Sequence, residues 1–300
     1  MINDRLKPHV YKIKGAKYLA FFDVLNGDFY HFRPGDDLYA VRRELKEAGL
    51  IFETPAPVPV KTKLNVPERG KEMVLKKLQI RIDGRGEDNC WHRQKIGKTK
   101  KKMSFHTTEK IIENLQHIPI HRLMVQAETY DRSIIFSLLN NLDFEEFHLI
   151  LEHGVTAEDI DLLRSQTQAG VRVGSPLPFP IREIITDPYD FFYNHSFNAC
   201  LGHQVAIDTR GEVRPCLWWP NEVGNIHREN LKDMIIGGCF NRFWDIAKNR
   251  IKGCKDCEYK YNCHDCRLNS ISPDEDPLAK PVFCNYDPYT GKGNKESRIL

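Results

Sequence analysis

The chain has 300 residues, a formal net charge of +3 and 41% hydrophobic residues. Its length allows two or three domains with a real apolar core, and its nearly balanced charge predicts neither a nucleic-acid partner nor a membrane partner. The first residues contain no apolar run typical of a signal peptide, and no stretch approaches the roughly 20 apolar residues of a membrane span. We therefore expect a cytoplasmic protein.

Residues 1–54 show an α+β pattern. Two strand-like segments flank the pair Asn26-Gly27, which is typical of a tight hairpin. These segments are residues 18–23 and 29–32. The pair Asp36-Asp37 then precedes apolar residues at helical spacing, and predicts a capped helix up to Leu50. A hairpin followed by a helix leaves an edge strand to which a peptide can add. We predict either a peptide-recognition unit or a structural cap on the next domain.

Residues 55–194 begin with a Pro-rich linker at 55–59 and then alternate between strand and helix patterns. The predicted strands are 75–82, 122–125, 144–151 and 171–173, and the predicted helices are 107–117, 131–142 and 156–167. This alternation predicts a parallel sheet, either open or part of a (β/α) barrel. Thr156 and Asp159 predict the start of the last of these helices. The segment is short for an eight-stranded barrel, which takes about 250 residues.

The loop after the first of these strands carries a single cysteine, Cys90, followed by a basic run at residues 93–102. Gly84-Arg85-Gly86 is too short for a dinucleotide fingerprint, and the chain has no Gly-Lys-Ser/Thr phosphate loop. We interpret the basic run as a solvated loop, with binding of an acidic partner as the alternative. The aromatic residues of 178–197 are interpreted as packing between the sheet region and the cysteine-rich region.

Eight of the nine cysteines lie between Cys200 and Cys284. A hairpin with Gly211 at its turn joins Cys200 to Cys216, a helix is predicted at 240–250, and two Cys-x2-Cys pairs follow. These pairs are Cys254 with Cys257 and Cys263 with Cys266. Cysteines that serve only packing are usually single and surrounded by apolar residues, whereas this spacing suits several sulfurs that converge on one metal or cluster. The odd cysteine count also argues against a complete disulfide framework.

From Cys200 to Cys284 the cysteines resemble those of a SPASM domain, over about residues 195–288. This is the auxiliary-cluster module of radical S-adenosylmethionine enzymes that modify peptides. The Gly-Glu-Val-Arg-Pro-Cys216 hairpin and Gly224-Asn-Ile226 add to the match. One departure is the spacing between Cys263 and Cys266, which is two residues where the family has three.

The resemblance implies two iron–sulfur clusters, of the 4Fe-4S type. Cys254, Cys257, Cys263 and Cys284 would hold one, and Cys200, Cys216 and Cys266 would hold the other. Many relatives place a fourth ligand just upstream of Cys200, where this chain has no cysteine. His195 or an open coordination site would take that place, and Cys239 and Cys90 are expected to be ordinary thiols.

The Cys-x3-Cys-x2-Cys motif of the radical enzymes is missing from this sequence. We therefore predict no reductive cleavage of S-adenosylmethionine, and interpret residues 55–194 as a shortened, degenerate (β/α) partial barrel like that of the radical enzymes. Behind an N-terminal hairpin and helix, this organisation is similar to the SPASM component of grasp-with-spasm systems. The resemblance implies an accessory role in maturation of a ribosomally synthesised peptide (a RiPP), with a precursor peptide and an ATP-grasp ligase as partners. Residues 289–300 are predicted to be a polar tail.

Two other interpretations stay open. One is a redox enzyme that uses an open iron at the Cys200, Cys216 and Cys266 cluster. The other is a binding module stapled by zinc, in which the two Cys-x2-Cys pairs form one tetrahedral site. Their five-residue spacer is shorter than the zinc-ribbon separation of about 15–20 residues. A single zinc site also leaves Cys200, Cys216 and Cys284 unexplained.

Overall fold

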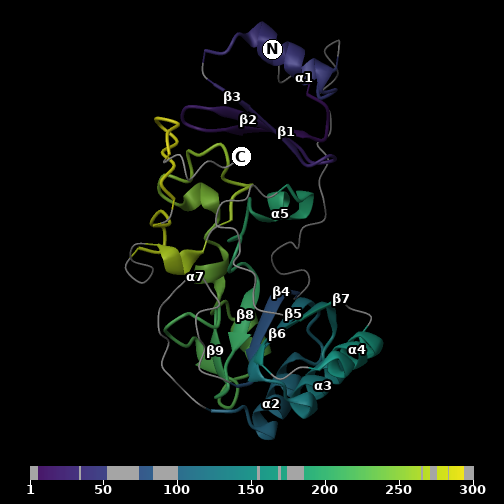
Figure 1. The fold of residues 1–300 in the computed structure, drawn as a ribbon. Helices are drawn as coiled ribbons and strands as arrows, with labels where there is room; N and C mark the ends of the chain where they lie inside the picture. Colours follow the sequence, from purple (N-terminus) through teal and green to yellow (C-terminus); the bar gives the residue numbers. More distant parts are fainter. Residues whose placement is uncertain are drawn as a thin grey trace. The chain divides into compact units, whose positions relative to one another are not determined.

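The computed structural model describes ten segments of the chain. They are residues 6–33, 35–52, 74–83, 101–153, 156–167, 170–173, 186–264, 266–270, 276–282 and 284–293. The predicted linker 55–59, Gly84 to Gly86, Cys90 and most of the basic run lie outside them. By its internal contacts the chain divides into two units (Figure 1). The first comprises Met1–Val66, Pro180–Cys200 and Ile246–Leu300, and the second comprises Pro67–Phe179 and Leu201–Asp245. The predicted domain boundaries after residues 54, 194 and 288 stay predictions.

A seven-stranded sheet, in the order β10-β9-β8-β4-β5-β6-β7, forms the second unit. Its strands are β4 (Leu75–Arg81), β5 (Ile120–Thr129), β6 (Phe144–His153), β7 (Gly170–Val173), β8 (Gln204–Ile207), β9 (Glu212–Arg214) and β10 (Gly224–Asn225). Neighbouring strands from β8 to β7 run parallel, whereas β9 and β10 are antiparallel. The α/β class and the parallel sheet are therefore confirmed, and the likeness to a shortened radical barrel stays a prediction.

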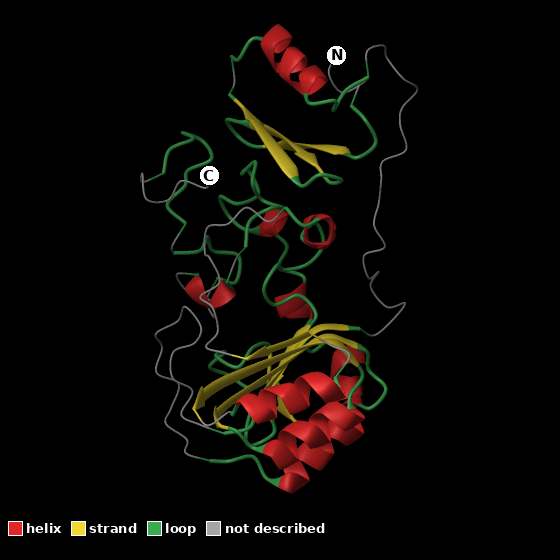
Figure 2. Ribbon diagram, turned by 45° about the vertical axis from the view of Figure 1, so that its right-hand side comes forward, coloured by secondary structure: helices red, strands yellow, loops and turns green. Residues whose placement is uncertain are grey.

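Three helices connect the strands from β4 to β7 and lie together on one face of the sheet (Figure 2). They are α2 (Phe105–Leu115), α3 (Arg132–Asn141) and α4 (Ala157–Gln166). Right-handed crossovers between parallel strands place successive helices in this way. The predicted start of α4 is confirmed, because Thr156 and Asp159 form a reciprocal capping box.

Side chains from neighbouring strands form apolar rows in this sheet. Leu78, Leu123 and Phe147 are register partners and are fully buried. Since successive side chains of a strand point to opposite faces, Gln79 and its register partner Met124 lie on the other face. The apolar rows match the face that the helices cover, and the opposite face carries buried polar groups such as Gln79 and Gln126.

A three-stranded antiparallel sheet, β1-β2-β3, begins the first unit. Its elements are β1 (Val10–Lys14), β2 (Leu19–Asp23), β3 (Asp28–Phe32) and helix α1 (Leu38–Glu47). The predicted hairpin is confirmed, with Gly27 at a φ of 75°, and Asp37 caps α1 as predicted. Strand β1 was not predicted from the sequence.

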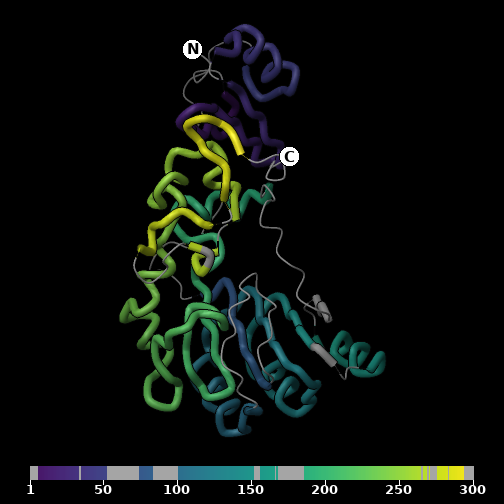
Figure 3. Tube along the Cα trace, turned by 60° about the vertical axis from the view of Figure 1, so that its left-hand side comes forward, coloured from purple at the N-terminus to yellow at the C-terminus, as the bar shows by residue number. Residues whose placement is uncertain are grey.

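Both faces of this small sheet are covered within the first unit. Val41 and Leu45 of α1 pack with Phe21 on one face. On the other, Phe22 contacts Phe191 of α5 (Pro188–Tyr193), with ring centroids 4.7 Å apart. The rings of α5 thus pack on the N-terminal strands, a partner that the prediction for 178–197 did not include. Figure 3 shows the C-terminal segment beside the same strands, where Lys17 Nζ donates to Thr290 O at 2.7 Å.

The predicted helix at 240–250 is wrong in its extent. The chain forms α7 (Asn241–Trp244), then an extended residue at Ala247, and then a 3-10 turn at Lys248–Arg250. Ile246 packs with Ile251 and Cys254, and this tertiary packing overrides the local helical pattern. A helix before it, α6 (Leu231–Ile236), was not predicted. None of the helices that the structure describes is long and apolar enough to cross a membrane.

Candidate metal centre

Consecutive backbone turns hold the first Cys-x2-Cys pair. The amide of Cys257 donates to the carbonyl of Cys254 at 3.0 Å, and Lys255 N donates to Ile251 O at the same distance. Cys254 is 7% exposed and packs with Ile251. The loop over residues 251–264, here called the cysteine loop, contains no strand and no α-helix. Backbone turns and side-chain contacts therefore maintain its shape.

Three thiols of this loop lie close enough together to influence one another. Burial raises the pKa of the Cys257 thiol, and the nearby Glu258, Cys263 and Cys254 raise it further. An isolated thiol in this position stays protonated at neutral pH, whereas a bound metal stabilises the thiolate. The donor set Cys254, Cys257 and Cys263 therefore fits a thiolate-bound metal group.

Two buried cations lie in this region, and one of them, Lys248, is beside a thiol of the loop. Lys248 is 3% exposed, and its Nζ lies 3.8 Å from Cys263 Sγ and 3.5 Å from His264 O. Arg267, which follows Cys266, is 1% exposed and donates to Pro277 O and Ala279 O. A buried ammonium near a thiolate offsets negative charge that water would otherwise stabilise. The sequence carried no signal for this role, because an isolated lysine in a predicted helix is ordinarily a surface residue.

Glu258 is a buried carboxylate next to a predicted ligand, and sequence reasoning missed it. Its side chain is 0% exposed, and Oε1 lies 3.0 Å from His31 Nε2 of β3. The hydroxyl of Tyr286 donates to the same oxygen. Tyr286 is two residues beyond Cys284, whose Sγ lies 4.0 Å from Tyr286 O. One carboxylate thus connects strand β3, the cysteine loop and the segment of Cys284.

His195 has the geometry of a metal-binding imidazole. Its Nδ1 lies 2.8 Å from the carbonyl of Phe191, and because a carbonyl only accepts, Nδ1 carries the proton. Burial lowers the pKa of the ring, so Nε2 keeps an unprotonated lone pair at neutral pH. Metal-binding histidines commonly donate their other ring nitrogen to a backbone carbonyl. The ring stacks on Tyr261 of the cysteine loop with centroids 3.5 Å apart. The assignment of His195 as a ligand stays a prediction.

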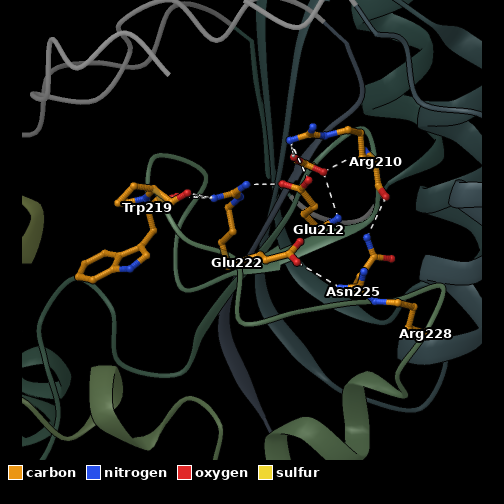
Figure 4. A network of polar contacts seen from close by, with 9 residues as sticks. Arg210, Glu212, Trp219, Glu222, Asn225 and Arg228 are labelled. Atoms are coloured by element: carbon orange, nitrogen blue, oxygen red, sulfur yellow. Dashed lines mark hydrogen bonds and ion pairs between the residues drawn. The ribbon is translucent and has the colours of Figure 1, made fainter. Parts of the chain in front are cut away.

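Cys216 lies in the second unit, on a loop fixed by buried side chains. Gln79 Oε1 accepts from Leu217 N at 3.2 Å, and Gln204 Nε2 donates to Pro215 O at 2.9 Å. Arg214 Nη1 donates to Trp219 O and Pro220 O, at 2.7 and 2.6 Å (Figure 4). These contacts clamp the backbone on both sides of Cys216, which is 4% exposed.

A wider polar network supports the hairpin that carries this loop. Arg214 also binds Glu212, whose other oxygen pairs with Arg210 Nη2 at 2.8 Å (Figure 4). Asn225 Nδ2 donates to Arg210 O at 3.2 Å, and Arg228 pairs with Glu222 at 3.1 Å. Gly211 has a φ of 74°, in keeping with the predicted hairpin turn.

The remaining predicted ligands lie in the first unit. Asn198, 1% exposed, accepts from Cys200 N at 3.0 Å and donates to Ile246 O at 3.1 Å. Cys266 and Cys284 are partly buried, and Cys239 is exposed. Since Cys200 and Cys216 belong to different units, the grouping of Cys200, Cys216 and Cys266 around a second cluster stays a prediction.

Comparison with known proteins supports iron–sulfur binding by the cysteine-rich region. The family model of the SPASM domain, described as an iron–sulfur cluster-binding domain, matches residues 200–258. The match contains Cys200, Cys216, Cys254 and Cys257, and the other predicted ligands lie outside it. The sequence matches none of the curated proteins with which it was compared. The chain therefore carries an iron–sulfur cluster-binding SPASM domain.

Proposed function

We propose that this protein is a cytoplasmic accessory factor in the maturation of a ribosomally synthesised peptide. Its SPASM domain would bind two iron–sulfur clusters, and the protein would bind the precursor peptide, an ATP-grasp ligase, or both. Bond-forming chemistry would belong to the ligase, because the sequence contains neither a phosphate-binding loop nor the three-cysteine radical motif.

One observation carries the cluster assignment: the SPASM match includes Cys254 and Cys257, and the thiols of Cys254 and Cys263 lie near that of Cys257. Within the described residues, no three thiol, imidazole or carboxylate groups lie close enough to hold a single metal ion. In a cluster each cysteine binds a different iron, so its sulfurs lie farther apart than the ligands of one ion. The five-residue spacer between the two Cys-x2-Cys pairs favours a cluster over the single zinc of the alternative hypothesis.

The edge of β3 supports a peptide partner. Among the described strands β3 pairs only with β2, so the amides and carbonyls of its other edge have no strand partner there. The faces of this sheet are covered by α1 and α5. An extended peptide would therefore add at the edge, through main-chain hydrogen bonds.

The first test is the iron and sulfide content of anaerobically purified protein, together with its visible absorption spectrum. We expect about eight irons and about eight sulfides per chain if both clusters are of the 4Fe-4S type. Zinc without sulfide would overturn the assignment. Incubation with S-adenosylmethionine and a reductant is expected to yield no 5′-deoxyadenosine, and its formation would contradict an accessory role. Co-purification with a candidate ATP-grasp ligase from the same organism tests the partner, and separate elution of the two proteins would count against it.

A further inference from the structure

We infer that strand β3 is a wall of the iron–sulfur site, which positions the ligand Cys257 and shields the cysteine loop. The inference rests on the proposed function, because it assumes a cluster bound by Cys254, Cys257 and Cys263. It assigns the N-terminal sheet a role in cluster retention that is separate from peptide binding at its edge.

His31 of β3 is in contact with Glu258 of the cysteine loop. The His31 side chain is 30% exposed, whereas the Glu258 side chain is 0% exposed and follows Cys257 directly. Oε1 accepts from His31 Nε2 at 3.0 Å and from the Tyr286 hydroxyl, and Oε2 has no hydrogen-bond partner in the described structure. A buried carboxylate depends on its few donors, because no water compensates for their loss. Removal of His31 therefore forces Glu258 to move, together with the backbone of Cys257.

Stacked rings also connect β3 to the cysteine loop. Phe29 and His31 alternate with Tyr30 and Phe32, which pack toward α1. Tyr259 stacks on Phe29 and on His31, in each case with centroids 5.3 Å apart. The face of β3 that does not meet α1 is therefore occupied by a residue two positions beyond Cys257.

The β1–β2 turn closely approaches the same loop. Ala16 N donates to Asp256 O at 2.6 Å. A Cβ on Gly15 would lie 2.7 Å from Glu258 Oε2 and 2.9 Å from Glu258 N, closer than side-chain atoms normally approach. The sheet thus meets residues 256–259 along two of its elements. Within the first unit this sheet therefore covers the cysteine loop, and a structural cap on the next domain stays a prediction.

The test measures how fast the loaded, full-length protein loses its cluster. Iron release to a strong chelator and the decay of visible absorption would be followed for His31→Ala and Phe29→Ala. We expect several-fold faster release from both. Tyr39→Ala, at a 73% exposed position on α1, is the matched control and is expected to release iron at the wild-type rate.

Two further measurements distinguish a role of His31 in positioning Cys257 from a role in general stability. One uses a conservative variant, and the other is the midpoint potential of the cluster. His31→Gln keeps a side-chain donor near Glu258 and is expected to restore slow release. The midpoint potential of the cluster should shift in His31→Ala and return toward the wild-type value in His31→Gln, because charge and hydrogen bonding near a cluster tune its potential. If His31→Ala does not fold, Tyr286→Phe removes the other donor to Glu258 and is expected to speed release in the same way.

The outcomes distinguish the two proposals. Wild-type protein without iron and sulfide overturns the proposed function and this inference together. Loaded variants that release iron at the wild-type rate, with an unchanged potential, overturn only the role of β3.

Discussion

The loop of Cys216 and the cysteine loop of residues 251–264 are held in place by different means. Cys216 follows a strand, and buried side chains of the seven-stranded sheet bind the backbone around it. The cysteine loop follows a 3-10 turn, and its shape depends on its own turns, on stacked rings and on the buried Lys248 and Glu258. The fold thus holds the Cys216 loop in place without a metal, whereas the cysteine loop contains ionisable groups that a bound metal would stabilise.

This difference indicates which of the two loops needs the cluster in order to stay folded. The hydrogen bond that Gln79 accepts and those that Gln204 and Arg214 donate do not depend on the state of the Cys216 sulfur. In the cysteine loop, burial and neighbouring thiols raise the pKa of Cys257. Folding and metal binding are coupled where ligands are brought together only by the metal. We expect such coupling in the cysteine loop and little of it at Cys216.

The largest expected effect is that of Cys257→Ala, or of complete cluster removal. Structural metal sites contribute apparent free energies on the order of 10 kcal/mol, so the first unit should lose its cooperative unfolding transition. Hydrogen exchange checks this directly: amides of 251–264 should lose protection, whereas those of β5 should keep it.

Cys239→Ala is the matched control, because Cys239 is exposed and is not a predicted ligand. It should leave iron content and exchange unchanged. If Cys257→Ala kept the melting temperature and the iron content of the wild type, the cysteine loop would depend on the cluster no more than the Cys216 loop does.

The next effect tests the sheet that carries Cys216. Leu78 is fully buried on β4, beside Gln79, and Leu78→Ala should lower the free energy of unfolding of the second unit by about 2–5 kcal/mol. Denaturant unfolding monitored by tryptophan fluorescence measures this loss. Iron bound by the first unit should be retained in native buffer, and equal loss of iron and sheet structure would contradict independent support of the two loops.

A smaller effect is expected from Arg214→Met, which removes the donors to Trp219 O and Pro220 O. Loss of charge-assisted hydrogen bonds from a buried side chain should cost about 2 kcal/mol. It should also raise the alkylation rate of Cys216 in metal-free protein, as mass spectrometry of labelled peptides can measure. Arg228→Met is the control, because Arg228 is 64% exposed in its pair with Glu222 and should cost less than about 0.5 kcal/mol. Similar alkylation in both variants would show that Arg214 does not hold the loop.

Much of the fold could be predicted because its signals are local. Asn26-Gly27 specified a hairpin, Thr156 and Asp159 specified a helix start, and alternating strands and helices specified a parallel sheet. The position of β8 next to β4 could not be predicted, because pairing between distant segments has no local signal. The helix predicted at 240–250 failed for the same reason, since the packing of Ile246 with Cys254 decides its end.

The residues of the candidate site likewise divide into those with a local sequence signal and those without one. Cysteine spacing pointed to the three thiols of the cysteine loop that the structure places near one another, because metal chemistry constrains the sequence directly, and their role as ligands stays a prediction. Lys248, Glu258 and Arg214 were missed, because each acts through burial, and Glu258 also acts through partners far away in the chain. His31 and Glu258 are separated by 227 residues, and neither position stands out in the sequence. Charged residues that support a metal site become visible only when the structure shows that they are buried.

The smallest effect concerns Asp131, whose side chain caps helix α3 of the second unit by accepting from Ile134 N. Burial raises the pKa of Asp131, but hydrogen bonds from Lys102, Ser133 and the amide of Ile134 outweigh it and lower the pKa from 3.8 to about 2. Asp131→Ala removes the helix cap and should cost about 1 kcal/mol at neutral pH, whereas Asp131→Asn keeps an acceptor and isolates the charge. Because the folded-state pKa lies below the unfolded value, this charge stabilises the protein above pH 3.8, and the contribution is lost as the pH falls toward 2. Urea unfolding measured from about pH 6 to about pH 3 should show that the difference in the free energy of unfolding between wild type and Asp131→Asn becomes smaller as the pH falls. If this difference in the free energy of unfolding did not change with pH, Asp131 would act only as a helix cap. The metal content of the first unit should not change in either variant.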